Sequence, residues 1–372
     1  MTSVSSGSTV RHAALLYGSA EELLAAAVPF LAAGLGDGDA VVLACRPEHT
    51  ALLTDALGHD DRILALDREG VYTRSANAVA TYRRVVRRGV AAGALAVRLI
   101  GEVPVDPRPR GWADWHRYEA IFNVALAPLP VASVCAYDIR ELTEPIGDGV
   151  EQTHPALLTA AGHRPNDRFV EPSIVLRRIT ATPADPVDHT PPTLSAPDLA
   201  DVTRLPELRA QLRAALAGAS CQEQLRSDFA AAVGEVLLNA YRHGRPPVAV
   251  RLWVTPTQLV CTVTDHGDGF DDPLAGYAPP DNGPRAAGAG LWLVRQACDV
   301  LEAAQTPTGF TVHLTTFLPG SDAARSTDSG TAGAEPASVR VERARASAKE
   351  LARRFPLGAS DLIGDDGAAS RA

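Results

Sequence analysis

The sequence predicts an α/β domain with a mainly parallel sheet and helices on both faces, followed by an α+β sandwich and a disordered tail. Three observations carry this prediction. Short apolar runs alternate with helical stretches up to about residue 180, prolines interrupt the chain at 181–197, and residues 198–319 place two amphipathic helices before several strands. A chain of 372 residues, 46% of them hydrophobic, is long enough for two such domains.

Residues 10–180 make up the predicted α/β domain. Its strand candidates are short runs of apolar residues, and its helix candidates lie between them. The strand candidates are 40–45, 62–66, 97–100 and 132–137, and the helix candidates are 20–34, 48–57, 75–93 and 112–127. Such alternation favours parallel strands, because each crossover helix returns the chain to the same end of the sheet.

The second half begins after a predicted linker at 181–197, where five prolines stand among small polar residues. Two amphipathic helices are then expected at 198–217 and 221–241. They are followed by strands at 248–255, 259–265 and 311–318. The tail, 320–372, is rich in Ser, Asp, Gly and Ala and is expected to be mostly disordered, with a helix at 339–355.

Composition and charge exclude several classes of function. The net charge of -9 argues against nucleic acid as a direct partner. The only lysine is Lys349 in the tail, so the folded part cannot supply the phosphate-binding lysine of a P-loop or of the eukaryotic kinase fold. The five scattered cysteines fit reduced thiols, and no apolar leader or membrane-spanning run is evident, so we expect a soluble, cytoplasmic protein without membrane contact.

One helix of the second half carries a line of hydrogen-bonding side chains. Glu235, Asn239 and His243 are spaced four residues apart, which places them along one helical face, and Gly244 follows as a natural helix end. A solvated polar face would show the same pattern. The spacing therefore indicates a candidate site only together with other motifs.

Two glycine motifs follow in order. Asp265-His-Gly267-Asp-Gly269-Phe comes at the end of a strand, where the carboxylate can accept a hydrogen bond from an exocyclic amine and the glycines let the backbone approach a flat ring. Gly288-Ala-Gly290-Leu291 opens an apolar helix expected to continue to Leu301, and free amides at such a helix start favour an anion. Taken singly, the first motif could be a surface turn and the second a plain loop.

Together these segments resemble the N, G1 and G2 boxes of the GHKL superfamily, whose ATP-binding domain has the Bergerat fold. The boxes are Glu235-x-x-x-Asn239-Ala-x-x-His243-Gly, Asp265-x-Gly267-x-Gly269-Phe and Gly288-x-Gly290-Leu291. Within the superfamily the compact first box is most similar to the anti-sigma-factor serine kinases. The resemblance implies that the second domain is an α+β sandwich of the Bergerat type.

The resemblance also implies a role for each residue, with ATP and Mg²⁺ as cofactors. Asn239 would hold Mg²⁺ and Asp265 would bind the adenine amine. The glycines of the first loop would shape the adenine pocket, and residues 271–287 would be a mobile lid. Backbone amides of Gly288, Gly290 and Leu291 would contact phosphate. Glu235 would be the general base. His243 would lie near the phosphates or have only a capping or packing role.

The first half resembles MEDS sensory domains. The residues that carry this similarity include His12, Tyr118-Glu119, the run Cys135-Ala-Tyr137-Asp and His154-Pro, together with the stretch 30–39. His12, Cys135 and Tyr137 are candidates for a signal-sensing site or, alternatively, structural residues of the domain core.

The leading functional hypothesis is an anti-sigma-factor-like serine/threonine kinase controlled by the first domain. Its partners would be a sigma factor, a STAS-type anti-sigma antagonist, or both, and a homodimer is left open. One alternative is an ATP-gated switch that transfers no phosphate. Another is a histidine-kinase-like protein that acts on a separate phosphotransfer protein, because none of the ten histidines stands in the pattern of a phospho-accepting helix.

Overall fold

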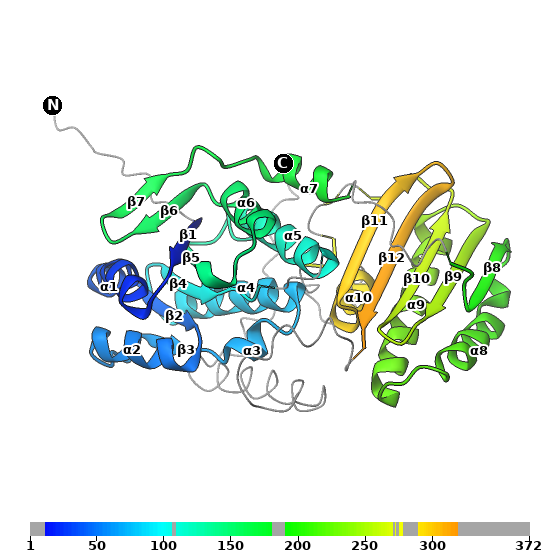
Figure 1. The fold of residues 1–372 in the computed structure, drawn as a ribbon, viewed down its shortest axis with the longest axis horizontal. Coiled ribbons are helices and arrows are strands. Elements are labelled where there is room, and N and C mark those ends of the chain that lie inside the picture. Colours follow the sequence, from blue (N-terminus) through cyan, green and yellow to red (C-terminus); the bar gives the residue numbers. More distant parts are fainter. Residues whose placement is uncertain are drawn as a thin grey trace, which may run out of the picture.

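The computed structural model describes residues 12–105, 109–180, 190–270, 272, 275–277 and 289–318 (Figure 1). The expectations for the tail, for Gly288 and for most of the segment 271–287 lie outside these residues. Within the described part, no helix is long and apolar enough to cross a membrane.

The chain folds into two units, each built around its own sheet (Figure 1). The first unit contains β1 (His12–Tyr17), α1 (Ala20–Asp37), β2 (Ala40–Ala44), α2 (Pro47–Leu57), β3 (Ile63–Ala65), α3 (Arg68–Val71), α4 (Ser75–Ala91), β4 (Val97–Glu102), α5 (Pro109–Ala125), β5 (Val131–Asp138), η1 (Ile139–Glu141), α6 (Glu144–Thr153), β6 (Ala156–Thr159), β7 (Gly162–Pro165) and α7 (Pro172–Thr180). The second contains β8 (Leu194–Leu199), η3 (Val202–Arg204), α8 (Leu205–Leu216), α9 (Glu223–His243), β9 (Val248–Val254), β10 (Gln258–Asp265), α10 (Ala289–Ala297), β11 (Val300–Thr306) and β12 (Gly309–Phe317).

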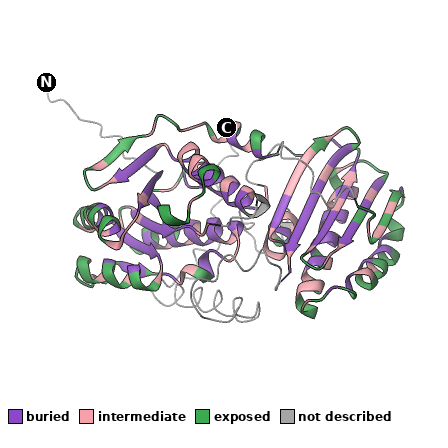
Figure 2. Ribbon diagram, viewed as in Figure 1, coloured by how far each residue is buried: buried purple, intermediate pink, exposed green. Residues whose placement is uncertain are grey.

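The first sheet has the order β3-β2-β4-β5-β1-β6-β7, and all its pairings are parallel except the final β6–β7 hairpin. Strands β2 and β5 are buried along their whole length (Figure 2). Helices α1 and α2 pack on one face through residues such as Leu31 and Leu53, while α4, α5 and α6 cover the other through Tyr82, Phe122 and Val150. The predicted parallel sheet with helices on both faces is therefore confirmed.

The second sheet has the order β11-β12-β10-β9-β8, and its strands are all antiparallel. Helices α8, α9 and α10 contribute Leu212, Leu237 and Val294 to one continuous core with this sheet. Helix α9 buries the face that carries Phe229, Val233 and Leu237 because these positions recur at helical spacing. The predicted α+β sandwich is confirmed.

Two element boundaries differ from the sequence expectation. The helix expected from residue 198 begins at Leu205, because Leu194–Leu199 pairs with β9 and the Asp201 side chain accepts a hydrogen bond from Thr203 N (2.8 Å) in the turn that follows. Part of the expected linker is thus a strand. The helix expected to reach Leu301 ends at Ala297, because Val300 and Leu301 pair with β12.

The two units touch through α4, α5 and α7 of the first and α10 and β11 of the second (Figure 1). The Arg74 side chain donates from Nε to the carbonyl oxygen of Gln296 (2.9 Å) and forms an ion pair with Asp299. Asp299 Oδ2 in turn accepts from the backbone N–H of Phe317 (2.8 Å). This contact fixes the end of α10 against the start of α4.

Candidate functional site

The polar side chains of α9 lie beside the start of α10. Glu235 and Asn239 are both half-buried on the same face of α9. A Cβ atom placed on Gly290 would lie 3.3 Å from Asn239 Nδ2 and 3.3 Å from Glu235 Oε2. The absence of a side chain at Gly290 therefore leaves a cradle in which the amide, the carboxylate and the first turn of α10 face each other.

Asp265, the last residue of β10, is buried and held in one orientation. Its Oδ1 atom accepts hydrogen bonds from Gly267 N (2.6 Å) and Arg245 N (3.3 Å). Because both bonds use Oδ1, the other oxygen can accept a bond from a ligand. A Cβ on Gly267 would lie 2.8 Å from the Cα of Gly244, so the glycine loop packs directly on the C-terminal end of α9.

The loop after Asp265 depends on a second glycine. Gly269 has a φ of 73°, in the left-handed region that glycine adopts without strain, and a side chain there would run into the Phe310 ring. Leu291 is half-buried in the first turn of α10, whereas His243 is exposed at the last residue of α9. The structure thus groups Glu235, Asn239 and Gly290, groups Asp265 with Gly267, and leaves the His243 side chain facing solvent.

Part of the expected lid contacts the first unit. Tyr277 is fully buried, and the Arg295 guanidinium lies over its ring at 4.0 Å from the centroid. Asp114 of α5 is 3.5 Å from the Tyr277 hydroxyl and 3.7 Å from Arg295 Nη1. Arg295 Nε also donates to the Ala275 carbonyl (3.2 Å). These four residues connect the segment between the two glycine motifs to both units.

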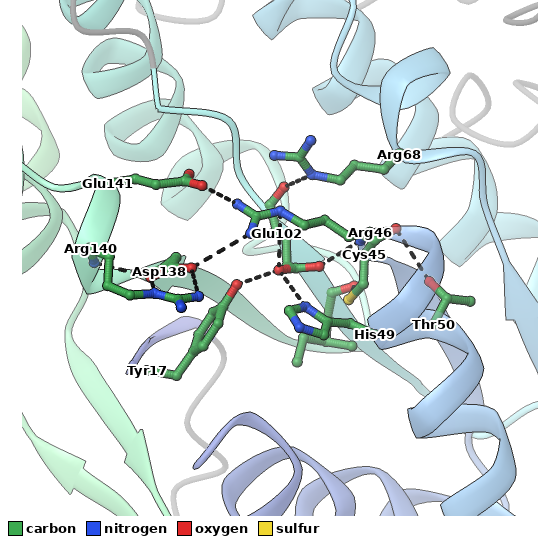
Figure 3. Close-up of polar contacts among 11 residues, drawn as sticks. Tyr17, Cys45, Arg46, His49, Thr50, Arg68, Glu102, Asp138, Arg140 and Glu141 are labelled. Atoms are coloured by element: carbon green, nitrogen blue, oxygen red, sulfur yellow. Dashed lines mark hydrogen bonds and ion pairs between the residues drawn. The ribbon is translucent and has the colours of Figure 1, made fainter. Parts of the chain in front are cut away.

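A second polar cluster, which sequence reasoning missed, lies at the carboxyl edge of the parallel sheet (Figure 3). Glu102, at the end of β4, accepts hydrogen bonds from the Tyr17 hydroxyl, from Arg46 N (2.5 Å) and from His49 Nδ1 (2.9 Å). Burial alone would raise the pKa of Glu102, but these three bonds outweigh it and lower the pKa. This edge is where ligands of open α/β sheets bind.

Arg46 connects this cluster to the neighbouring strand. Its guanidinium lies 3.6 Å from Asp138 at the end of β5 and 2.7 Å from Glu141. Three strands, β1, β4 and β5, therefore end in Tyr17, Glu102 and Asp138. The signal available in the sequence was a polar residue that closes each of several apolar runs.

Comparison with known proteins assigns both units. Residues 11–155 match the family described as MEDS, the methanogen/methylotroph DcmR sensory domain, and residues 199–316 match the histidine kinase-like ATPase domain family. The chain joins a MEDS domain to a histidine kinase-like ATPase domain. The strand β8 falls largely before the second match, and α7 lies after the first.

Among solved structures, the RsbU and RsbW domains of a Mycobacterium tuberculosis protein match with 24% identity and a TM-score of 0.25. The match covers 35% of this chain and 33% of that one, so the chain spans about a third of that structure's length. No curated protein matches the chain.

Replacing Glu102 by Gln is expected to destabilise the MEDS domain by about 2–3 kcal/mol at neutral pH, because three donors then face a neutral amide. The pKa of Glu102 is lower in the folded protein than the ordinary carboxyl pKa, so at a pH above the ordinary pKa the charged carboxylate stabilises the fold. This stabilisation is lost as the pH falls through the lowered pKa of the folded state. Urea unfolding at several pH values should show that the difference in free energy of unfolding between wild type and E102Q becomes smaller as the pH falls.

Glu141→Gln is the matched control, since this more exposed carboxylate also pairs with Arg46. Its cost should stay below about 1 kcal/mol. Two results would contradict the assignment of Glu102 as a buried, charged acceptor. One is equal stability of E102Q and wild type at neutral pH, and the other is a difference in free energy of unfolding that grows as the pH falls.

Proposed function

We propose that the ATPase domain binds Mg²⁺·ATP and acts as an anti-sigma-factor-like serine/threonine kinase under the control of the MEDS domain. The observation that carries this proposal is the cradle at Gly290, where the Asn239 amide and the Glu235 carboxylate meet the first turn of α10. Oxygen ligands suit Mg²⁺, and free amides at a helix start suit phosphate. The residues present therefore fit the cofactor.

Each residue has a distinct task in this proposal. Asn239 holds the metal through its amide oxygen, and Asp265 accepts a hydrogen bond from the adenine amine. The amides of Gly288, Gly290 and Leu291 would contact the phosphates. Bound there, Mg²⁺·ATP supplies the phosphoryl group. Glu235 accepts the proton of the attacking hydroxyl. Most of the catalysis in such a transfer comes from positioning the reactants and neutralising charge.

Incubation of the full-length protein with γ-labelled ATP and candidate STAS-type antagonists or sigma factors tests the reaction class. Acid-stable label on serine or threonine of the partner supports the kinase. Acid-labile label would instead support a histidine-kinase-like protein acting in trans. Nucleotide binding without any transfer would leave a nucleotide-gated switch.

One observation favours the switch as a second candidate. Tyr277 lies between the two glycine motifs of the ATPase domain, yet its hydroxyl faces Asp114 of the MEDS helix α5. The MEDS domain thereby contacts the segment that adjoins the nucleotide site, and a change in one can bias the other whether or not phosphate is transferred.

Asn239→Ala is expected to weaken ATP affinity at least about tenfold, or ~1.4 kcal/mol, because a metal ligand is lost. Isothermal titration with Mg²⁺·ATP measures this, and Gln224→Ala, an exposed amide at the start of the same helix, is the control. Unchanged affinity in N239A would remove Asn239 from the metal site.

Glu235→Gln is expected to leave ATP affinity near the wild-type value while phosphotransfer falls by about 10²-fold or more, because the amide cannot accept the hydroxyl proton. Single-turnover transfer assays separate the two quantities. Glu223→Gln, on the same helix, should change neither. A parallel loss of affinity and transfer in E235Q would argue against a base and for a binding role.

Tyr277→Ala is expected to disconnect the two domains, because it removes the ring that contacts Arg295 and Asp114. In wild type, ATP should slow hydrogen exchange at amides of α5 in the MEDS domain, and in Y277A this slowing should disappear. Tyr241→Ala is the control, since that hydroxyl donates to the Leu199 carbonyl oxygen within the ATPase domain. Retained ATP-dependent protection of α5 in Y277A would contradict the coupling.

A further inference from the structure

Four potential metal ligands meet in the core of the MEDS domain, away from the Glu102 cluster. His12 comes from β1, Glu119 from α5, Cys135 from β5 and His154 from the end of α6. All four are buried, with exposed fractions between 0% and 3%, and their ligand atoms lie within 4.8 Å of one another. No other group of three or more such residues occurs in the described part of the chain.

The distances centre on one carboxylate oxygen. Glu119 Oε2 lies 3.4 Å from His12 Nε2, 3.3 Å from His154 Nε2 and 3.5 Å from Cys135 Sγ. His12 Nε2 and Cys135 Sγ are 3.3 Å apart. Tetrahedral zinc, with its usual bonds to nitrogen and sulfur, separates neighbouring ligand atoms by roughly 3.3–3.6 Å. The four separations above fall in this range, and all the ligand atoms lie within 4.8 Å of one another.

The surrounding hydrogen bonds point the ligand atoms inward. Asn123 Nδ2 donates to the carbonyl oxygens of Glu119 (3.0 Å) and Thr153 (2.8 Å), so its oxygen faces His12 Nδ1 at 3.0 Å and accepts that proton. His154 Nδ1 donates to the Val150 carbonyl oxygen (2.7 Å). Both imidazoles therefore present Nε2 to the centre of the cluster, as metal-bound histidines do.

Glu119 is oriented in the same way. The Tyr137 hydroxyl donates to its Oε1 atom, which leaves Oε2 facing the two imidazoles and the thiol. Tyr137 thus binds the carboxylate oxygen that does not face the cluster. In metal sites, residues that hydrogen-bond a ligand in this way orient it toward the metal.

The arrangement brings electron-rich atoms together in a dry interior. Because each Nδ1 atom faces an oxygen of Asn123 or Val150, each Nε2 atom faces the Glu119 oxygen, and His154 Nε2 is buried without a hydrogen-bond partner. In the described part of the chain, Glu119 forms ion pairs with two histidines, His12 and His154. A buried carboxylate of this kind requires a compensating cation.

We propose that His12, Glu119, Cys135 and His154 bind one Zn²⁺ ion in the core of the MEDS domain. Two imidazole nitrogens, a thiolate and one carboxylate oxygen form a donor set that zinc favours over Mg²⁺ or Ca²⁺. The thiolate and the carboxylate balance the charge of the ion once the Cys135 proton has left to solvent. Four protein ligands fill the coordination sphere and leave no open position for a substrate, so the role of the ion is structural.

Full-length protein without an affinity tag tests the proposal. After removal of metal with a chelator, one equivalent of zinc per chain should bind, as measured by elemental analysis after dialysis. Cobalt(II) in place of zinc should give the intense visible bands of a tetrahedral site and a near-ultraviolet thiolate charge-transfer band. Binding of well under one equivalent, or a cobalt spectrum without the thiolate band, overturns the site.

Cys135→Ser should lose the charge-transfer band and weaken zinc binding at least about tenfold, and the matched Cys45→Ser, a buried cysteine directly after β2, should keep both. Tyr137→Phe keeps all four ligands and should lower zinc affinity about tenfold or more, with the thiolate band intact. If C135S does not fold, the zinc affinity of Y137F and the number of zinc ions bound per wild-type chain still test the proposal. Zinc bound equally by C135S and wild type refutes the proposal.

Discussion

The burial of charge on helix α5 constrains the whole molecule. Asp114 and Glu119 lie five positions apart on this helix, and neither is more than 6% exposed. A buried ionised group is tolerated only where partners compensate for the lost hydration. The position of helix α5 therefore has to place Glu119 beside His12 and His154, and Asp114 beside Arg295 of the ATPase domain.

This double requirement gives the contact between the domains its specificity. An apolar interface would tolerate sliding, whereas Asp114 needs both Arg295 and the Tyr277 hydroxyl at defined places. Arg74 adds a second anchor at the end of α10 through Gln296 and Asp299. The start of α10 forms the Gly290 cradle, so the helix that the MEDS domain fixes at one end borders the proposed nucleotide site at the other.

Sequence periodicity predicted the elements that bury one face and missed those defined by pairing alone. The helix expected at 221–241 and the strands expected at 248–255 and 259–265 correspond to α9, β9 and β10, because their apolar positions recur at the required spacing. Strand β8 has no such pattern and exists because Leu194–Leu199 extends the edge of a sheet. Val300 and Leu301 continue an apolar run, and only their pairing with β12 makes them a strand.

In the candidate site too, local spacing could be predicted from the sequence and contacts between distant residues could not. The spacing of Glu235 and Asn239 places both on one helical face, which the sequence alone can specify. The position of Gly290 against them depends on how α10 packs on α9, a contact between residues more than fifty positions apart. Tyr277 could not be predicted as a link between domains, because its partner Asp114 belongs to a helix on the other side of the chain's midpoint.

The MEDS sheet offers an internal comparison of two buried carboxylates. Glu102 is 1% exposed and Glu119 is fully buried, and each accepts a hydrogen bond from a tyrosine hydroxyl. Glu102 also accepts a backbone N–H and lies 3.9 Å from the Arg46 guanidinium, so its charge has a permanent cation nearby. Glu119 has imidazoles in that place. The proposed zinc ion would supply at Glu119 the positive charge that the Arg46 guanidinium supplies at Glu102.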